Sequence, residues 1–376
     1  MRVAASALTA CLLTSGALLS AAPAADAGDS STIGGPLLAS TGTVVHAGPG
    51  VAPLPQHITA RSWLVADLDS GAVLAARGAH VKYLPASTLK TLTAITLLPR
   101  LHRGQTFAAT YRDATVDGTR VGLVPGYHYR IGKLFQAMLM VSANDAADAL
   151  AQANGGIGKT VSEMNAEARH LQADDTHAMT PSGLDGPGES ESAYDLALFA
   201  RAAMAMPVFR RIVETVRSPI PAPHHKHYQM YTHNYLLYTY RGDLGGKNGY
   251  TVAAHATYWT VARRDGHTVL VTLMDANPDF WPDARSLLAW GFHADGTVQP
   301  VGQLVSPLTP KPATEPVHVQ PVAATGRPAV TASSSPWTRR HEIEIGVLAV
   351  SLLILAAVLI RRRRARPRPR YTLPPI

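Results

Sequence analysis

The sequence predicts an α+β fold, within the broad α/β class, in which an antiparallel sheet is flanked by helices and carries a helical insert. Three observations lead to this prediction. Short apolar runs typical of strands occur near both ends of residues 55–300, turn sequences separate them in pairs, and helical apolar spacing fills the middle. Strands from the two ends can complete one sheet, which the intervening helices then cover.

Two hairpins are predicted, one from each end of this globular part. Each consists of two short apolar runs that flank a turn sequence favouring a reversal of the chain. The runs are Trp63–Asp67 and Ala72–Ala76 around Asp69-Ser70-Gly71, and Thr257–Arg263 and Thr268–Met274 around Asp265-Gly266. We expect these four runs to pair in the central sheet.

Six segments carry apolar residues at the three- and four-residue spacing of a helix that buries one face. Pro85 precedes the first segment and suits the first turn of a helix. The segments are Ala86–Leu98, Ile131–Met140, Ala146–Gln152, Val161–Leu171, Ser192–Met204 and Ala284–Trp290. The first five predict the helical insert, and the last predicts a closing helix after the final strand.

The segments outside the globular part predict export and a membrane anchor. Residues 1–27 contain a long apolar run that ends in a small-x-small cleavage pattern, as in a secretory signal. Residues 28–54 are expected to form a flexible leader, and residues 301–340 a stalk rich in Pro, Ala and Thr. Residues 343–360 are predicted to be a transmembrane helix, since the arginines of residues 361–376 favour the cytoplasmic side. The globular part would then face the outside of the cell.

The charge distribution argues against a nucleic-acid partner. The formal net charge is +8, but seven arginines lie within residues 361–376 and Arg2 lies in the signal. The part between them is therefore close to neutral, and the basic balance belongs to a tail beside the membrane. The one cysteine, Cys11, also lies in the signal, so the exported chain has no disulfide and no thiol nucleophile.

Three short motifs stand in order along the globular part. The first has a serine and a lysine three residues apart, the second a serine and an asparagine two apart, and the third a lysine and a glycine two apart. They are Ser87-Thr88-Leu89-Lys90, Ser142-Ala143-Asn144 and Lys247-Asn248-Gly249. Each motif alone is a weak signal, but their order and domain-sized gaps match the signature of penicillin-binding proteins and β-lactamases.

The first motif has a physical basis in helix geometry. Residues three apart lie on one helix face, so the Lys90 amine can reach the hydroxyl of Ser87. A serine hydroxyl needs a neighbouring base to become a nucleophile. A lysine can supply that base if a dry pocket and a second cation lower its pKa, and Lys247 is the candidate second cation. The N-terminal end of the helix also directs N–H groups toward developing negative charge.

The residues around the motifs resemble those of the serine D-alanyl-D-alanine carboxypeptidases, the low-molecular-weight penicillin-binding proteins. The resemblance covers about residues 55–295 and implies a β-lactamase/transpeptidase-like fold. It also implies removal of the terminal D-Ala from peptidoglycan stem peptides, covalent inhibition by β-lactam antibiotics, and no cofactor. The similar stretches are Pro85-Ala86-Ser87, Val121–Gly126, Asn144–Ala147, Thr180–Asp185 and His233–Leu237.

The same resemblance implies roles for the catalytic side chains. Ser87 attacks the carbonyl of the penultimate D-Ala and becomes acylated, while Lys90 takes its proton. Ser142 relays a proton to the amine of the leaving D-Ala. The backbone N–H groups of Ser87 and Tyr250 form the oxyanion hole.

A second group of residues is implied to bind the substrate. Asn144 bonds the substrate backbone, and Lys247 attracts its terminal carboxylate. The sequence departs from the family at the middle of the third motif, where Asn248 replaces the usual Thr or Ser and Thr251 could supply a hydroxyl instead. The expected binding residues are Asn144, Lys247, Asn248, Gly249, Tyr250 and Thr251.

The same residues suggest two alternative functions. A β-lactamase of the same fold would need a Glu that activates water; residues 170–188 contain none, and Glu189 and Glu191 fit no E-x-x-L-N run. A non-catalytic sensor of penicillin or muropeptide draws support from Asn248 alone. No metal site is predicted. The cluster His224, His225, His227 and His233 matches no zinc spacing and reads as a solvated loop near the pocket, while Asp174-Asp175 and Asp67 with Asp69 read as solvated caps.

Overall fold

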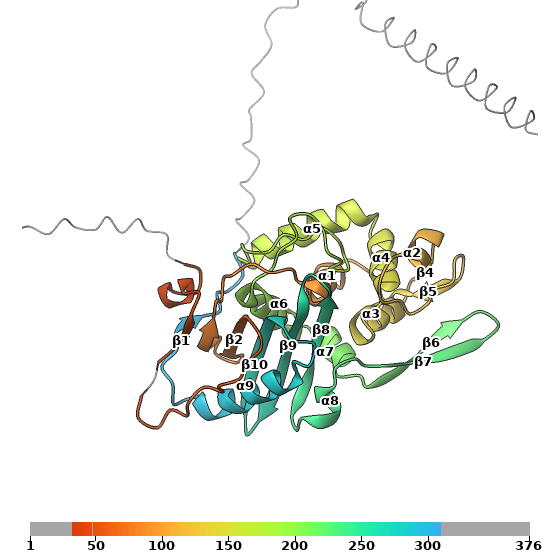
Figure 1. The fold of residues 1–376 in the computed structure, drawn as a ribbon. Helices are drawn as coiled ribbons and strands as arrows, with labels where there is room; N and C mark the ends of the chain where they lie inside the picture. Colours follow the sequence, from red (N-terminus) through yellow and green to blue (C-terminus); the bar gives the residue numbers. More distant parts are fainter. Residues whose placement is uncertain (1–31, 47, 310–376) are drawn as a thin grey trace, which may run out of the picture. The chain divides into compact units, whose positions relative to one another are not determined.

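One antiparallel sheet organises the part of the chain that the computed structural model describes, residues 32–46 and 48–309 (Figure 1). Its strand order is β1-β3-β2-β10-β9-β8, and β11 also pairs with β3. The sheet strands are β1 (Thr43–Val45), β2 (Ser62–Asp67), β3 (Ala72–Arg77), β8 (Asp243–Thr251), β9 (His255–Arg264), β10 (His267–Ala276) and β11 (Gly302–Gln303). The α+β fold with one antiparallel sheet is confirmed.

The two predicted hairpins form and meet in the middle of the sheet. β2 pairs with β3, and β10 pairs with β9 across the Asp265-Gly266 turn. β2 and β10 then pair with each other, with Val65 opposite Val271. Strands from the two ends of the chain therefore complete one sheet, as the sequence predicts.

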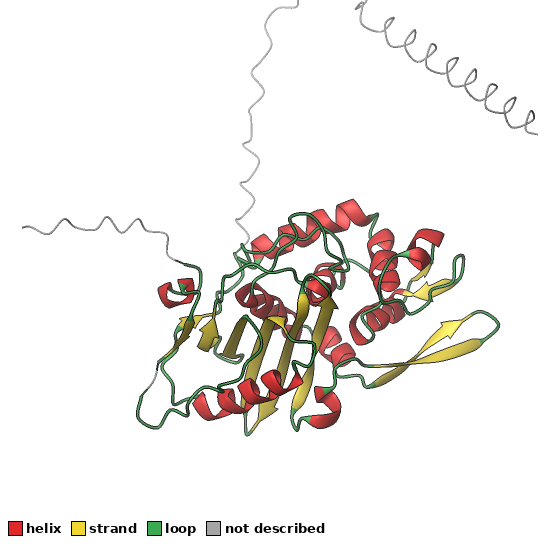
Figure 2. Ribbon diagram, in the orientation of Figure 1, coloured by secondary structure: helices red, strands yellow, loops and turns green. Residues whose placement is uncertain are grey.

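Both faces of the sheet are covered. Leu64 and Ala66 of β2 pack into a core shared with the helical layer, whereas Trp63 and Val65 pack into a second core beneath α9 (Trp281–Ala294). Figure 2 shows α9 running across one face with most other helices on the far side or beside the sheet. Because each face is buried, β2 reads as a continuous apolar run without alternation.

Each of the six predicted helices has a counterpart in the structure. Ile131–Met140 matches α3 residue for residue, while the first segment begins as a 3₁₀ turn. The sequence does not predict the 3₁₀ helix η1 (Pro36–Ala39) or the short helices α2 (Tyr111–Thr115), α7 (Pro207–Val213) and α8 (Leu236–Thr239). The remaining helices are η2 (Ala86–Leu89), α1 (Lys90–Leu97), α3 (Ile131–Met140), α4 (Asn144–Ala153), α5 (Ile157–His170) and α6 (Ala193–Ala205).

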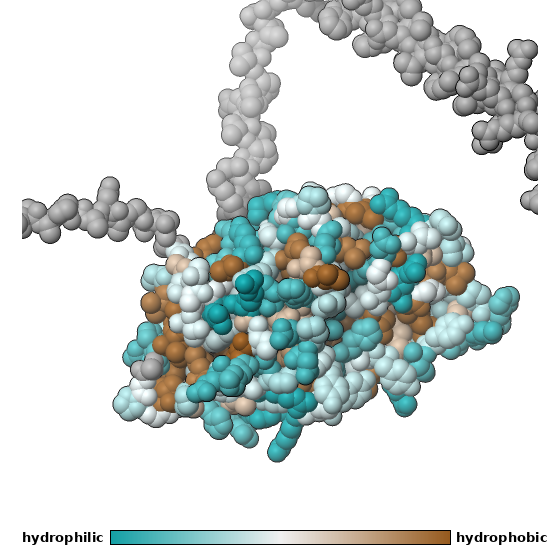
Figure 3. Space-filling view, viewed as in Figure 1, coloured by the Kyte–Doolittle hydropathy of each residue, from teal (hydrophilic) through white to brown (hydrophobic). Residues whose placement is uncertain are grey.

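The boundaries expected for the leader and the stalk need correction. Within residues 28–54, Leu38 is fully buried and Thr43–Val45 form strand β1. Within residues 301–340, Gly302–Gln303 pair with β3. Strands of two or three residues carry too little pattern to be recognised, and their pairing partners are distant in sequence. Apolar side chains are visible at the surface around β1 (Figure 3), where the chain packs onto the second core.

The histidine-rich stretch is not a simple loop. His224 and His225 lie in the turn of a separate hairpin formed by β6 (Arg217–Ala222) and β7 (Lys226–Tyr231), which projects from the body of the fold (Figure 1). His227 lies within β7, and His233 follows it.

β6 could not be predicted from the sequence because it contains Pro219 and Pro221. Proline lacks the N–H that donates a hydrogen bond to a neighbouring strand, so it argues against a strand. Because the two prolines are two residues apart, their backbone nitrogens point to the same side of β6, and this is the side that makes no hydrogen bonds to β7. A further short pair joins β4 (Thr106–Ala108) to β5 (His128–Arg130).

Several predicted segments lie outside the described residues. These are the signal at 1–27, most of the stalk at 301–340, the transmembrane helix at 343–360 and the tail at 361–376. Within residues 32–46 and 48–309, every helix falls short of the length and apolar character that crossing a bilayer requires.

Candidate active site

The three motifs meet in one cluster of side chains. The Lys90 Nζ lies 2.8 Å from the Ser87 Oγ and 2.7 Å from the Asn144 Oδ1. The Lys247 Nζ lies 3.1 Å from the Ser142 Oγ. A helix turn, an interhelical loop and a strand from distant parts of the sequence thus supply one site, as their order predicts.

Local structure explains how each element presents its side chain. Ser87 lies in η2, directly before α1, and remains partly accessible. Ser142 lies between α3 and α4 with a φ of +60°, an unusual value for a residue with a Cβ. Ala86, next to Ser87, has a φ of +46°. Backbone strain of this kind collects at functional sites, where the surrounding structure holds it in place.

The hydrogen bonds around Lys90 determine which way its lone pair points. Its Nζ contacts the Asn144 Oδ1 and, at 2.6 Å, the carbonyl oxygen of Ser182. The Asn144 amide is oriented by its Nδ2, which donates to the Asp117 carbonyl at 2.7 Å. Both neighbours of the amine are therefore acceptors. A neutral amine has two hydrogens to donate to them, so its lone pair faces the hydroxyl of Ser87.

Burial of two amines together favours that neutral form. The side chains of Lys90 and Lys247 are both almost completely excluded from solvent. Desolvation, aided by the nearby Lys247 ammonium, holds the pKa of Lys90 well below its ordinary value. Desolvation also lowers the pKa of Lys247 to about 7. Two buried cations close together are unfavourable, which favours the loss of a proton from one of them.

Two glycines allow the backbone to close tightly around Ser87. A Cβ at Gly249 would lie 2.5 Å from the Ser87 backbone nitrogen and 2.5 Å from the Thr257 Oγ1. A Cβ at Gly183 would lie 1.8 Å from the carbonyl oxygen of Ala86. Only glycine fits at either position. The glycine of the third motif therefore brings β8 against the backbone of the nucleophile's turn.

The other predicted binding residues follow Lys247 along β8. Asn248 is partly buried, and its side chain has no hydrogen-bond partner among the described residues. Tyr250 is about half exposed. The Thr251 hydroxyl donates to the Asp185 Oδ1 at 2.7 Å. Its hydrogen is therefore already used and is not free to bind the substrate carboxylate. The amide of Asn248 is thus better placed to substitute for the usual hydroxyl.

Some supporting residues were not identified from the sequence. The carbonyl of Ser182 contacts Lys90, and the fully buried Glu191 accepts from the Thr88 Oγ1 at 3.0 Å. Desolvation raises the pKa of Glu191 well above its ordinary value, which favours the neutral carboxyl. The Thr180–Asp185 stretch was a signal for Ser182, but a backbone carbonyl leaves no trace in the residue type. In the sequence, Glu191 stands out only as a candidate base for a β-lactamase.

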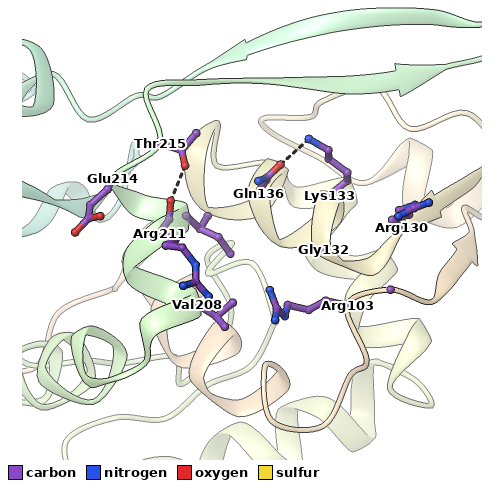
Figure 4. A pocket seen from close by; sticks show the side chains of 11 residues that line it. Arg103, Arg130, Gly132, Lys133, Gln136, Val208, Arg211, Glu214 and Thr215 are labelled. Carbon is purple, nitrogen blue, oxygen red and sulfur yellow. Dashed lines mark hydrogen bonds between the residues drawn. The ribbon is translucent and has the colours of Figure 1, made fainter.

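A large cavity lies elsewhere. It has a volume of about 810 Å³ and opens between the start of α3 and the end of α7, whereas Ser142 follows the other end of α3. Figure 4 shows Arg103 and Arg211 extending toward this space from different elements. The cavity is open and cationic, and none of the motif residues lines it. Proximity of the motif residues, and not cavity size, identifies the site.

One prediction about acidic residues is corrected. Asp175 is not a solvated cap, since its Oδ2 lies 2.7 Å from the Nδ1 of His80 and both side chains are about four-fifths buried. Asp67 does act as a turn cap, accepting from the backbone of Asp69 and Ser70.

Comparison with known proteins gives a consistent result. A family model described as D-alanyl-D-alanine carboxypeptidase matches residues 50–278. D-alanyl-D-alanine carboxypeptidase DacB2 of Mycobacterium tuberculosis is 42% identical over 250 residues, covering 65% of this chain and 85% of that protein. A crystal structure of a D-alanyl-D-alanine carboxypeptidase from the same organism has 40% identity and a TM-score of 0.65, covering 68% of this chain and 98% of that one. A Streptomyces DD-transpeptidase, at 23% identity and a TM-score of 0.60, shares the fold and covers 64% and 99% of the respective chains.

Proposed function

Because the chain belongs to the D-alanyl-D-alanine carboxypeptidase family, we propose that it removes the terminal D-Ala of peptidoglycan stem peptides through an acyl-enzyme on Ser87. The activity is that of a serine peptidase. The observation that carries the assignment to Ser87 is the 2.8 Å contact between its Oγ and the Nζ of Lys90. That amine has acceptors at its other two positions, so it is suited to receive a proton from the hydroxyl.

Acylation then takes a definite course. Lys90 accepts the proton of Ser87 while the Oγ forms a bond to the carbonyl carbon of the penultimate D-Ala. The backbone N–H groups of Ser87 and Tyr250 hold the negative oxygen of the tetrahedral intermediate. The bond to the terminal D-Ala breaks as Ser142 gives its hydroxyl proton to the leaving amine and takes up in exchange the proton that Lys90 received. Water subsequently hydrolyses the ester and restores the Ser87 hydroxyl.

Substrate binding uses the other members of the cluster. Asn144 meets the peptide backbone of the substrate, and protonated Lys247 attracts the terminal carboxylate. Asn248 offers an N–H of its amide to the same carboxylate. Gly249 and Tyr250 contribute the backbone of β8, while Thr251 acts through its bond to Asp185. β-Lactam antibiotics would acylate Ser87 in the same way and remain attached.

A release assay and mass spectrometry test this proposal together. The protein should release free D-Ala from a diacyl-Lys-D-Ala-D-Ala peptide and gain a penicillin adduct on the peptide that contains Ser87. Ser87→Ala should abolish both, with a loss of about 10⁴-fold or more in rate. Ser70→Ala, in an exposed turn, is the matched control and should retain both. An adduct on another peptide would refute the assignment of the nucleophile.

The structure disfavours the β-lactamase interpretation. A lactamase of the best-known type needs an ionised Glu that activates water. Glu191 is fully buried and bonded to Thr88, and desolvation raises its pKa, which disfavours the ionised form. Desolvation also raises the pKa of Glu189 to about 7, and its Oε1 accepts from the backbone of Met179. Rapid hydrolysis of a chromogenic cephalosporin would overturn this conclusion.

We propose further that the protein is exported and held at the outer face of the bacterial membrane. The support is in the sequence: a signal at 1–27, an apolar run within 343–360 and arginines in 361–376. Full-length protein should sediment with membranes and be accessible to protease added to spheroplasts. A chain ending at residue 340 should appear in the medium. Equal distribution of the two forms would refute the anchor.

A further inference from the structure

A second polar cluster lies away from the motif residues. It consists of His80 after β3, Asp175 between α5 and α6, and Asp195 in the first turn of α6. One potential ligand atom from each side chain lies within 4.8 Å of the other two. All three residues line a cavity of about 320 Å³ that Ile33 also borders.

The hydrogen bonds of His80 determine which of its nitrogens is available. The Nε2 lies 3.0 Å from the carbonyl oxygen of Ile33, which can only accept, so this nitrogen carries a hydrogen. In a neutral imidazole the Nδ1 is then a bare lone pair. Yet this atom lies 2.7 Å from the Asp175 Oδ2, which is also an acceptor when ionised. A cation must therefore sit between them, either a proton or a metal ion.

The surroundings of the buried Asp195 carboxyl favour a metal ion over a proton as the cation in this cluster. This residue is 1% exposed, and its Oδ2 accepts from the Thr176 Oγ1 at 2.8 Å. Its Oδ1 is buried and has no hydrogen-bond partner among the described residues. An unpartnered buried carboxylate oxygen is costly, and such atoms call for a specific explanation. Asp195 lines the same cavity as His80.

We propose that His80, Asp175 and Asp195 bind a divalent transition-metal ion, with Zn²⁺ as the ion used to test it. The His80 Nδ1 and one carboxylate oxygen from each aspartate are ligands that Zn²⁺ accepts, and water in the cavity can complete four-coordination. The bond from His80 to the Ile33 carbonyl is the outer contact that usually orients a metal-binding histidine. Two carboxylates neutralise the ion.

The charged groups near the cluster are compatible with a bound metal ion. The Lys82 Nζ lies 3.7 Å from the Asp175 Oδ1, the oxygen that faces away from His80 in this pairing. The Oδ2 therefore remains available as a ligand. Asp174 also borders the cavity and adds negative charge. The Tyr194 ring packs against the His80 ring, with centroids 4.7 Å apart, and restricts its rotation.

The ion would join segments that hold the active site. His80 lies seven residues before Ser87, and the chain between Asp175 and Asp195 contains both Ser182 and Glu191. The stretch from His80 to Ser87 and the α5–α6 connection also meet where Tyr83 bridges Glu191. A metal at this position would fix the N-terminal segment, the approach to the nucleophile and the α5–α6 connection to one another. It would act on stability without touching the substrate.

Zinc binding by the full chain tests the proposal. After treatment with a chelator and dialysis, calorimetric titration with ZnCl₂ should show one site whose signal is lost in Asp195→Asn and His80→Gln. Zinc at about 100 times its dissociation constant should raise the unfolding temperature of the wild type by roughly 5 °C. Cobalt should give visible ligand-field bands in the wild type only.

A matched variant separates this site from other histidines. His267 forms an equivalent pair, its Nδ1 lying 2.7 Å from the Asp295 Oδ2, but it is exposed and the described part of the chain places no second acid beside it. His267→Gln should leave the zinc response unchanged. The unfolding temperature of metal-free Asp195→Asn confirms that this variant is folded. Equal zinc binding in wild type and Asp195→Asn, or no zinc response in either, would overturn the proposal and leave a proton between His80 and Asp175.

Discussion

The two ends of α3 lead to two cationic regions that differ in every other respect. Beyond its last residue, Ser142 meets Lys247 in a closed site that also contains Lys90. At its first turn, Arg130 and Lys133 line the open cavity that also contains Arg103 and Arg211 (Figure 4). The first region contains amines that water does not reach. The second contains exposed guanidinium groups.

The difference shows how burial changes what a positive charge can do. Arginine stays protonated in proteins, and an exposed guanidinium is stabilised by water. It can attract an anion but cannot take up a proton. A buried lysine loses its hydration, and a second buried lysine beside it makes the charged form still less favourable. Lys90 can therefore act as a base, which the exposed guanidinium groups of the open cavity cannot do.

The largest expected effect comes from removing the base. Lys90→Gln keeps a hydrogen-bond donor near Asn144 and Ser182 but has no basic lone pair. We expect the kcat/KM for D-Ala release to fall by about 10²- to 10⁴-fold, the usual contribution of a general base. Lys133→Gln makes the same change at the other end of α3 and should retain the rate within about twofold. Similar losses in both variants would remove the distinction between the two regions.

The second prediction concerns the contact between β8 and the nucleophile. Gly249→Ala places a Cβ 2.5 Å from the Ser87 backbone nitrogen, so the strand must move away. Because that N–H is the proposed oxyanion donor, we expect a loss of at least about 100-fold in kcat. Gly158→Ala is the control, since a Cβ there meets nothing within 4 Å and the position is helical. Full activity in Gly249→Ala would show that β8 does not shape the oxyanion hole.

These contacts also show what could be predicted from the sequence and what could not. The hairpins and long helices could be predicted from the spacing of apolar residues, because buried side chains recur along the sequence at intervals typical of a strand or a helix. The motif residues could be named because reactive side chains are specific to residue type. Their convergence followed from family resemblance, and the bonds from Lys90 to Ser87 and Asn144 agree with it.

The remaining features depend on long-range geometry. The Ser182 carbonyl reaches Lys90 through a backbone atom that every residue possesses. Asp175 looked like an exposed turn residue because its partner, His80, lies 95 positions away. Strands β1 and β11 are defined by their pairing with β3 and not by their composition. Such pairings become visible only when the chain is folded.

A third prediction uses the pH dependence of stability. In the folded protein desolvation lowers the pKa of Lys247 to about 7, while in the unfolded chain it returns to its ordinary value of 10.5. Below pH 7 both states are protonated, and the folded state bears the cost of a buried charge. Between pH 7 and pH 10.5 the Lys247 side chain binds more protons in the unfolded state than in the folded state. The contribution of Lys247 to the free energy of unfolding therefore rises with pH in this range.

Lys247→Met removes that cost. We expect the variant to be more stable than the wild type at pH 6, by about 1–4 kcal/mol, and this advantage to shrink toward pH 9. Urea unfolding at the two pH values measures it. Lys226→Met, in the exposed hairpin β6–β7, should show no such dependence on pH. A constant difference for Lys247→Met would mean that its ammonium is not destabilised by burial.

The smallest effect is expected in the open cavity. Arg211→Gln removes a charge from an exposed side chain that has no salt-bridge partner among residues 32–46 and 48–309. We expect the free energy of unfolding to change by less than about 0.5 kcal/mol. D-Ala release should stay within about twofold of the wild type, because the cavity and the motif cluster lie beyond opposite ends of α3. A tenfold rise in KM that disappears at high salt would instead show that the arginines attract the anionic peptide before it reaches Ser87.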